Sequence, residues 1–399
     1  SKLTTQAEGE QIAGNISIDA RDRIEITNDS TISANGDIGF IEIGSNSAIA
    51  PRTVRINRSF LTTTNKTSEA NEDEEINSGF INIDAIKEIW ILGGSQLEAQ
   101  TERRGDAGYI SLNTPDEGHV FLDNSKIFNN VEPGGIGNGG VIQIETGSLS
   151  LSNNSQLQTL VRGIDEQETQ VAPAQGNGGA VIVNASGDVS LQNSRILSSV
   201  EAGGIGDAGS VKIKADSLFL INDARLNVNN EVQGNAGDIT LNANRVALSN
   251  NAEVTAETVG GQGGNILITA PDLLLLRNES NISTSAGTET TPGDGGTITI
   301  NVDEGFVVAI PSENSNIVAN AFGGQGGAIT INANRILGLQ PENRVTTGEA
   351  LNNIIDNPPS QISAGSDIGL EGTIEINTLV IDPSQGLGEL PIDVVDPSN

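Results

Sequence analysis

A glycine-led phrase, Gly-x-(Ile/Val)-x-(Ile/Leu/Val)-x-(Ala/Thr), recurs along the whole chain and constrains its fold more than any other feature. Gly237-Asp238-Ile239-Thr240-Leu241-Asn242-Ala243 is a typical copy. About twelve copies are present, beginning at Gly14, Gly39, Gly79, Gly108, Gly140, Gly179, Gly209, Gly237, Gly264, Gly296, Gly327 and Gly372. Most starts are about 27 to 32 residues apart, a period typical of solenoids and propellers.

Each repeat contains three short runs in which apolar and polar residues alternate. The glycine phrase is the first run, Val246-Ala247-Leu248 is an example of the second, and residues 250–254 show the third. Alternation with a period of two points one face of a strand inward and the other outward, so all three runs are predicted to be strands. The Gly, Asn, Asp and Ser residues between the runs favour tight turns.

Three strands and three corners per repeat predict an all-β fold, a parallel β-helix in which each strand pairs with its counterpart one repeat away. One coil cannot bury its apolar face alone, so its stability must come from stacking. About twelve coils, each roughly 4.8 Å high, predict a rod about 58 Å long with a core of Ile, Val, Leu and Ala. We assign residues 1–378 to this solenoid.

One asparagine position falls at the same point of most repeats, two residues after the last apolar residue of the second run. Its members are Asn28, Asn124, Asn153, Asn193, Asn222, Asn250 and Asn278. Stacked coils would bring consecutive members together, so their amides are expected to bond along the stack or to hold a left-handed corner. Arg58 and Gly93 replace the asparagine in two repeats, and those coils are predicted to turn differently.

The composition excludes several classes of partner. The formal net charge of −32 repels nucleic acid and anionic membranes, so we expect no nucleic-acid partner. No stretch approaches the roughly 20 apolar residues of a membrane span, so no membrane insertion is expected. The absence of cysteine excludes disulfides and thiolate metal sites.

The glycine-rich stretches resemble ligand-binding loops only in part. Residues 134–140 and 323–327 lack the Lys-Ser/Thr pair of a phosphate-binding loop, and no helix follows them, so tight corners are expected. Gly203-Gly204-Ile205-Gly206-Asp207 resembles part of a calcium-binding nonapeptide repeat, but its Asp is one place early and the nine-residue period is absent. We therefore predict no cofactor-binding and no metal-binding residues.

Parallel β-helices include polysaccharide lyases and hydrolases, whose sites gather carboxylates with Arg, Lys or His on adjacent coils. The chain has one histidine, His119, and no recurring carboxylate pattern accompanies it. Arg103, Arg104 and Asp106 are interpreted as a solvated turn. We therefore predict no catalytic residues, and a polysaccharide lyase or hydrolase is the least favoured function.

Three intervals between glycine phrases are longer than the rest. They contain residues 62–75, 162–170 and 340–359, and the last includes a predicted short helix at residues 347–355. Insertions in solenoids map to loops, which often form the binding face. Residues 379–399 are predicted to form an extended tail, punctuated by proline, that either caps the last coil or adds a strand to a neighbouring molecule.

The coil phrases and the closing stretch resemble filamentous haemagglutinin-like proteins of cyanobacteria. The closing stretch comprises residues 372–378, Asp382-Pro383-Ser384-Gln385-Gly386-Leu387, Glu389-Leu390-Pro391 and Val394-Val395-Asp396-Pro397-Ser398-Asn399. The resemblance implies a right-handed parallel β-helix, two-partner secretion through an outer-membrane transporter, and a role at the cell surface. The family's N-terminal secretion domain is not evident in these residues, so we expect a processed form or a part of a longer protein.

The repeat, the tail and the resemblance together favour an extracellular structural and adhesive protein. We expect a building block of a cell-surface fibre or layer whose copies associate head to tail. The alternative is a monomeric adhesin that binds glycans or another cell-surface partner through its projecting loops.

Overall fold

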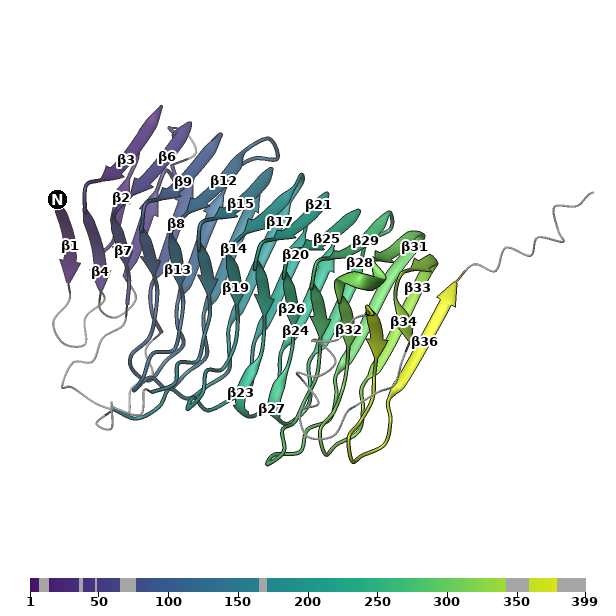
Figure 1. Cartoon of the computed structure of the whole chain (residues 1–399). Helices are drawn as coiled ribbons and strands as arrows, with labels where there is room; N and C mark the ends of the chain where they lie inside the picture. The colour runs from purple at the N-terminus through teal and green to yellow at the C-terminus, as the bar shows by residue number, and fades with distance from the viewer. Residues whose placement is uncertain are drawn as a thin grey trace, which may run out of the picture.

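The strands of this chain wind into one continuous parallel β-solenoid (Figure 1). The structure, a computed structural model, describes residues 1–6, 14–35, 39–46, 49–64, 77–164, 171–341 and 359–378. Within these ranges the strands pair in parallel, and the one helical element is a single 3₁₀ turn, η1 (Pro311–Glu313). The predicted all-β, parallel fold is therefore confirmed.

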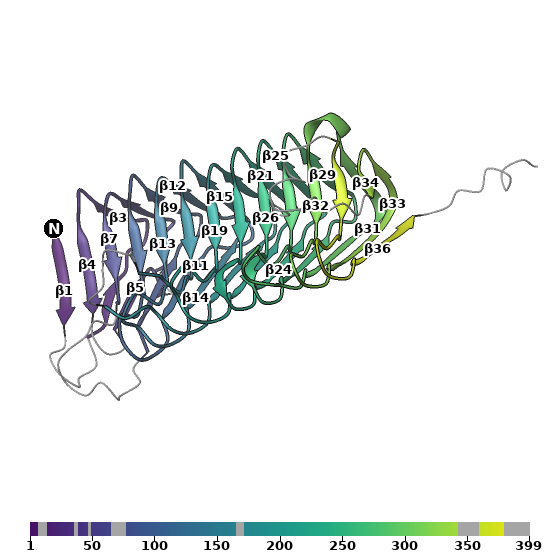
Figure 2. The same ribbon diagram turned by 60° about the horizontal axis from the view of Figure 1, so that its bottom comes forward.

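Three strands follow one another in each turn, and their counterparts in successive turns stack into three columns (Figures 1 and 2). The first column consists of the glycine phrases. It contains β2 (Ile16–Ile18), β5 (Phe40–Ile43), β8 (Phe80–Asp84), β11 (Tyr109–Asn113), β14 (Val141–Thr146), β17 (Ala180–Ala185), β20 (Ser210–Lys214), β24 (Asp238–Asn242), β28 (Asn265–Thr269), the first halves of β31 (Thr297–Ala309) and β33 (Ala328–Leu337), and β36 (Thr373–Thr378).

The second column follows directly and joins the first into one sheet, because β31 and β33 each run through both columns. It contains β3 (Arg23–Thr27), β6 (Thr53–Asn57), β9 (Glu88–Leu92), β12 (His119–Asp123), β15 (Ser148–Ser152), β18 (Val189–Gln192), β21 (Ser217–Ile221), β25 (Arg245–Ser249), β29 (Leu273–Arg277) and the second halves of β31 and β33.

The third column forms a separate sheet of shorter strands. It contains β1 (Lys2–Gln6), β4 (Thr31–Asn35), β7 (Phe60–Thr62), β10 (Gln96–Glu98), β13 (Lys126–Phe128), β16 (Gln156–Gln158), β19 (Arg195–Leu197), β22 (Arg225–Asn227), β26 (Glu253–Thr255), β30 (Asn281–Ser283), β32 (Asn316–Val318), β35 (Gln361–Ser363) and β34 (Gln340–Pro341). A separate two-stranded sheet is formed by β23 (Asn230–Gln233) and β27 (Thr258–Gly260), which follow the third-column strands β22 and β26 in the chain.

The solenoid has about ten turns, fewer than the twelve predicted. Ten turns, from β2–β3–β4 to β31–β32, have all three strands within the described residues. The phrase at Gly327 opens a turn that passes through residues outside the described ranges, and the phrase at Gly372 contributes the single strand β36. The sequence pattern counts each phrase as a coil, even where the described chain closes no complete turn.

The core is a column of aliphatic side chains that runs along the solenoid. The strand register places Ile41 beside Ile81, Ile81 beside Ile110, and Ile110 beside Ile142, and all four are fully buried. They belong to a single cluster of buried apolar residues that continues to the last turns. Each side chain therefore packs on its equivalents in both neighbouring turns, which is how a repeat that is unstable alone becomes stable in a stack.

Each phrase opens with glycine because successive turns pack too closely there for a side chain. The backbone angle at these positions does not itself demand glycine. A Cβ on Gly209 would lie 2.0 Å from the carbonyl oxygen of Gly179, and one on Gly237 would lie 1.9 Å from that of Gly209. The expected tight corners occur at other glycines, such as Gly134 (φ 90°) and Gly203 (φ 91°). The repeated phrase therefore marks the place where successive backbones approach most closely.

The third column ends with its strands out of chain order. β35 pairs with β32 on one edge and with β34 on the other, although β34 precedes β35 in the chain. β34 contains Pro341, which has no N–H to offer a further strand. The third column is thus closed at this end, whereas β36, the last strand of the first column, pairs only with β33 within the described chain.

Candidate functional site

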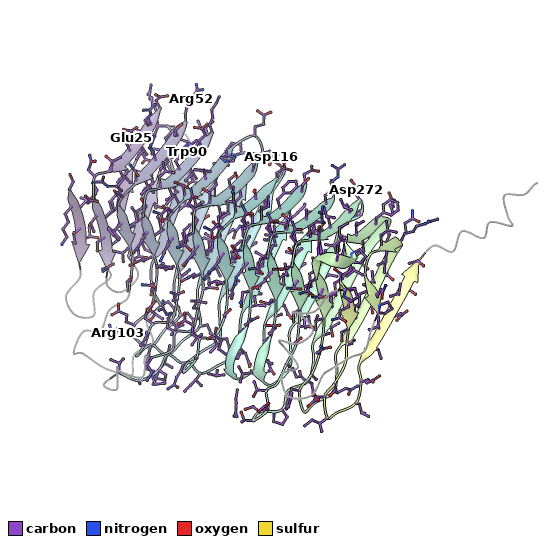
Figure 3. The ribbon with its side chains drawn as sticks, viewed as in Figure 1. Glu25, Arg52, Trp90, Arg103, Asp116 and Asp272 are labelled. Atoms are coloured by element: carbon purple, nitrogen blue, oxygen red, sulfur yellow. The ribbon has the colours of Figure 1, made fainter. Side chains whose placement is uncertain are left out.

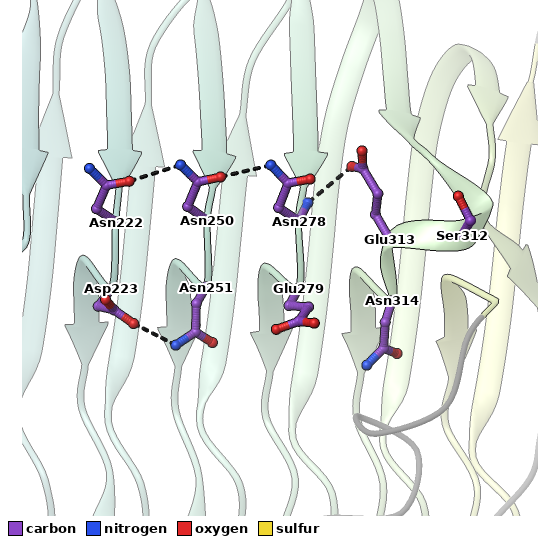
Figure 4. A pocket seen from close by; sticks show the side chains of 9 residues that line it. All are labelled: Asn222, Asp223, Asn250, Asn251, Asn278, Glu279, Ser312, Glu313 and Asn314. Atoms are coloured by element: carbon purple, nitrogen blue, oxygen red, sulfur yellow. Dashed lines mark hydrogen bonds between the residues drawn. The ribbon is translucent and has the colours of Figure 1, made fainter.

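The asparagine position forms a left-handed corner between the second and third strands of each turn. The φ angles of all seven of its asparagines lie between 46° and 60°. Their amides also bond along the stack, because Asn250 Nδ2 donates to Asn222 Oδ1 at 2.8 Å and Asn278 Nδ2 donates to Asn250 Oδ1 at 2.7 Å (Figure 4). The left-handed corner is confirmed for the whole column, and the amide ladder for these three residues.

The prediction that coils without this asparagine turn differently is wrong. Arg58 (φ 49°) and Gly93 (φ 65°) adopt the same left-handed conformation as the asparagines. The Arg58 N–H donates to the Leu92 carbonyl at 3.1 Å, and its own carbonyl accepts from Asp29 N–H at 2.7 Å. Hydrogen bonds to the turns on both sides therefore determine the corner, even for a residue that disfavours it.

A polar groove of about 730 Å³ lies along this corner near the C-terminal end (Figure 4). Two stacked columns and one serine line it: Asn222, Asn250, Asn278 and Glu313; Asp223, Asn251, Glu279 and Asn314; and Ser312. All of these side chains carry amide, carboxyl or hydroxyl groups. The groove can therefore offer hydrogen bonds to a polar ligand, and no apolar side chain lines it.

The turn η1 places Glu313 at the end of the amide ladder, where Arg277 holds it. Arg277 Nε and Nη2 donate to Glu313 Oε2 and Oε1 at 2.6 and 2.7 Å, and these bonds hold the pKa of Glu313 below its usual value. A half-turn of the Asn278 amide would place its Nδ2 3.1 Å from Glu313 Oε1. If the amides of Asn222 and Asn250 were turned as well, each amide N–H would donate to the residue of the next turn, and the last would donate to the Glu313 carboxylate.

A second groove, of about 460 Å³, continues onto the outer face of the third column and shares three residues with the first. Burial raises the pKa of the Glu257 carboxyl, against the effect of a hydrogen bond from Ser283 Oγ. The neighbouring Glu253 pairs with Arg225, whose Nε lies 3.2 Å from Oε2. Two of the four carboxylates of this groove, Glu253 and Glu257, are thus engaged by protein groups.

A third groove, of about 700 Å³, contains a row of charged side chains, one from each of five successive turns. The row consists of Glu102, Glu132, Arg162, Glu201 and Glu231. Arg162 Nε lies 2.9 Å from Glu201 Oε2, and burial raises the pKa of Glu201 while Arg162 lowers it. Sequence reasoning missed this row, because its members are about 30 residues apart and only the stacking brings them together.

Asp207, from the stretch that resembles a calcium repeat, has a structural role. Its Oδ1 accepts from the Asn235 N–H at 2.7 Å, and the Asp207 N–H donates to Asn177 Oδ1 at 3.0 Å. Equivalent bonds join Asp106 to Asn138 at 2.6 Å, so one polar column holds this corner over many turns. The described residues contain no group of three or more His, Cys, Asp or Glu side chains that could hold a metal ion.

The only tryptophan and the only histidine of the chain lie side by side on the outer face of the second column. The Trp90 ring meets the Phe121 ring edge-on, with centroids 4.9 Å apart, and its centroid lies 6.4 Å from that of His119. Trp90 Nε1 donates to Glu88 Oε2 at 3.0 Å. This is an aromatic surface in a chain with only 3% aromatic residues.

His119 is the strongest candidate for acid–base chemistry, and its surroundings do not complete a catalytic site. Its Nδ1 lies 2.5 Å from Ser148 Oγ. Burial lowers the pKa of the imidazole, while the charge of Glu88 raises it. The Glu88 carboxylate bonds to the indole of Trp90 instead of orienting the imidazole. The sequence could not show the contact with Ser148, which lies one turn away.

The remaining predicted features fall partly outside the described chain. Arg104 is exposed, and Asp106 belongs to the polar corner column described above. The predicted projecting loops fall mainly on residues 65–76, 165–170 and 342–358, the predicted helix on residues 347–355, and the tail on residues 379–399. All of these lie outside the described residues.

The sequence matches no protein-family model, and comparisons with curated proteins and with solved structures returned no match. Within the described chain, no helix has the length and apolar character needed to cross a membrane.

Proposed function

We propose that this protein is an extracellular structural and adhesive protein, a building block of a cell-surface fibre or layer whose copies join head to tail. The observation that carries the proposal is the unpaired edge of β36. The first column begins at β2 and ends at β36, and within the described residues each of these strands pairs on one side only. An unpaired strand edge is a template for pairing with another chain.

The direction of the backbone groups of β36 identifies the donors on this edge. The Thr373 N–H donates to the Gly327 carbonyl at 2.9 Å, so Thr373, Glu375 and Asn377 direct their backbone groups toward β33. In a parallel ladder, alternate residues face opposite neighbours. Ile374, Ile376 and Thr378 therefore direct their N–H and C=O groups toward the open edge.

The polarity of the solenoid determines how two copies can join. Because the strands are parallel, a second copy continues the sheet in the same sense only if its N-terminal end docks on this C-terminal end. Such a head-to-tail contact does not close, so it generates a fibre. The closed third column leaves the first column, with exposed Ile368 and Leu370 nearby, as the favoured joint.

The extracellular location and export by two-partner secretion are part of the proposal and are supported by the family resemblance. The net charge of −32 is consistent with a rod that stays soluble and repels nucleic acid. No catalytic role is proposed, and three of the groove carboxylates, Glu253, Glu201 and Glu257, are engaged by Arg225, Arg162 and Ser283.

Electron microscopy of the purified chain and of one edge variant tests the joint. Ile376→Pro removes an N–H that faces the open edge without removing a bond to β33, so we expect it to abolish filaments. Ile376→Val is the matched control, because it keeps the N–H, and it should form filaments of normal length. Filaments of Ile376→Pro that match the wild type, or a wild-type chain that stays monomeric, would contradict the proposal.

A chain that ends at Thr378 separates two forms of the joint. If β36 itself pairs with the next copy, filaments persist without residues 379–399. If these residues supply the connecting strand, the shortened chain stays monomeric while keeping the thermal stability of the solenoid.

A further inference from the structure

The outer face on the N-terminal side of Trp90, over β3, β6 and β9, differs in charge from the rest of the molecule. Residues 21–29, 51–58 and 86–92, which contain β3, β6 and β9, carry six basic and four acidic side chains, a local net charge of +2. The whole chain carries −32. Figure 3 shows Glu25 on β3, Trp90 on β9 and Arg52 directly before β6, near the N-terminal end.

Four of the six basic side chains, Arg21, Arg52, Arg55 and Lys87, are not neutralised by ion pairs within the described chain, and the last three lie beside β9. Arg23 pairs with Glu25 at 3.1 Å and Arg58 with Asp29 at 3.2 Å. Within the described chain, Arg52, Arg55 and Lys87 form no ion pair. All three are exposed, so their charges are available to a ligand.

The stacking of the turns brings these charges to the aromatic surface. Arg55 is the register partner of Trp90, and both side chains face outward from the sheet. The Lys87 N–H donates to the Arg52 carbonyl at 2.9 Å, which places these two residues side by side, three residues before Arg55 and Trp90 in their turns. The face therefore combines an indole, a phenyl ring and three free cations.

We propose that this face binds an acidic polysaccharide, with a uronic acid ring against Trp90 and sugar carboxylates paired with Arg55, Arg52 and Lys87. The apolar faces of a sugar ring suit the partly exposed indole of Trp90, which contributes large contact area at low entropic cost. Guanidinium groups bind carboxylates through paired hydrogen bonds. An extended sheet face offers equivalent positions at intervals of roughly 4.8 Å, which suits a linear polymer.

Charge complementarity favours this occupant. A ligand with anionic groups is attracted to these strands and repelled by the acidic remainder of the chain. The proposed function uses the ends of the rod, whereas Arg55 and Trp90 lie one and two turns inward of β3, so they stay free in a head-to-tail fibre. The inference thus adds an adhesive surface to the fibre and does not depend on the fibre joint.

Trp90 is itself the probe, because it is the only tryptophan in the chain. Titrating the full chain with tetragalacturonate should give a saturable change in tryptophan fluorescence that weakens as sodium chloride is added. Maltotetraose has the same number of rings and no carboxylates, and it should bind at least about tenfold more weakly, the effect of about 1.4 kcal/mol.

Charge variants test the role of the basic residues. The double variant Arg52→Gln/Arg55→Gln should bind tetragalacturonate at least about tenfold more weakly, because two charge-assisted contacts are lost. Arg245→Gln is the matched control, since Arg245 opens β25 on the same column and lies far along the rod. It should keep the wild-type affinity. Calorimetry on Trp90→Phe, which has no fluorescent indole, should show weaker binding with an unchanged melting temperature.

Three results would overturn the proposal. The first is no saturable signal with tetragalacturonate. The second is an equal loss of affinity in Arg245→Gln, which would show general charge screening. The third is a fluorescence change that follows protein concentration in the absence of sugar, which would assign the face to a second copy of this chain.

Discussion

At the scale of single residues, a few polar side chains repeat one hydrogen bond in turn after turn. The fully buried Ser155 accepts from the Ser125 N–H at 3.3 Å through Oγ, and Ser194 accepts in the same way from Ser155 at 3.2 Å. The same hydroxyl of Ser155 donates to the Ser152 carbonyl at 2.7 Å. Each serine thus satisfies backbone groups that the corner would otherwise leave buried and unpaired.

Glu257 is expected to destabilise the folded chain at neutral pH. Burial raises the pKa of this carboxyl above its ordinary value of 4.5, so the folded state binds more protons than the unfolded state as the pH rises above 4.5. Glu257→Gln should therefore increase the melting temperature at pH 7 and have little effect at pH 4. Glu253→Gln, which loses an ion pair with Arg225, should decrease it slightly. A lower melting temperature for Glu257→Gln at pH 7 would contradict the assignment.

Protonation of His119 should lower the stability of the folded chain at acidic pH. Burial lowers its pKa below the ordinary 6.5, so the unfolded state binds the proton more readily. The stabilisation by neutral His119 is complete above pH 6.5 and decreases as the pH falls through the folded-state pKa. Thermal melts of the wild type and of His119→Gln between pH 7.5 and 5 should show the smaller change in the variant. Equal changes in both proteins would contradict this.

At the scale of the strand, the in-register glycine column determines how closely the turns approach. The positions above and below Gly209 are also glycines, Gly179 and Gly237, and each would place a Cβ about 2 Å from a carbonyl oxygen of the turn before it. The N–H of Ser210, the next residue, donates to the Gly179 carbonyl at 2.9 Å. The same close contact that excludes a side chain therefore allows the ladder to begin at this point.

Gly209→Ala should destabilise the solenoid by about 1 to 3 kcal/mol, because the added methyl group overlaps the backbone of the preceding turn. Ser210→Ala is the matched control in the same strand, and it should change stability by no more than about 0.5 kcal/mol. Denaturant unfolding followed by circular dichroism measures both values. A smaller effect for Gly209→Ala than for Ser210→Ala would show that the turns can separate at this column.

At the scale of the whole molecule, the rod is strongly acidic and its two ends differ. The charge of −32 makes copies repel one another, while the open edge of β36 favours their association. The basic face beside Trp90 is a local exception near the N-terminal end. Assembly should therefore depend on how strongly salt screens the charge.

Raising the sodium chloride concentration should lengthen the proposed filaments. The Debye length falls from about 30 Å at 0.01 M to about 8 Å at 0.15 M, so repulsion between acidic rods weakens over this range. Filament length by electron microscopy, with light scattering on the same samples, is the measurement. Filaments that shorten at 0.15 M would indicate that salt-sensitive attraction, and not backbone pairing, holds the joint.

The sequence by itself determined the fold class, the strand positions and the left-handed asparagine corner. These features depend on alternation, spacing and residue type, which are local and repeat in every unit. The same local reasoning failed for Arg58 and Gly93, because hydrogen bonds from neighbouring turns hold their corners. It also overcounted the turns, because a phrase such as that at Gly372 can contribute a strand without closing a coil.

Only the tertiary structure decided which distant residues meet. Trp90, Arg55 and His119 come from three different repeats, and the placement of β34 beyond β35 reverses the chain order. Local patterns carry no information about such contacts, because these depend on the register between turns and on the lengths of the insertions. The candidate binding face and the open edge of β36 both follow from that register.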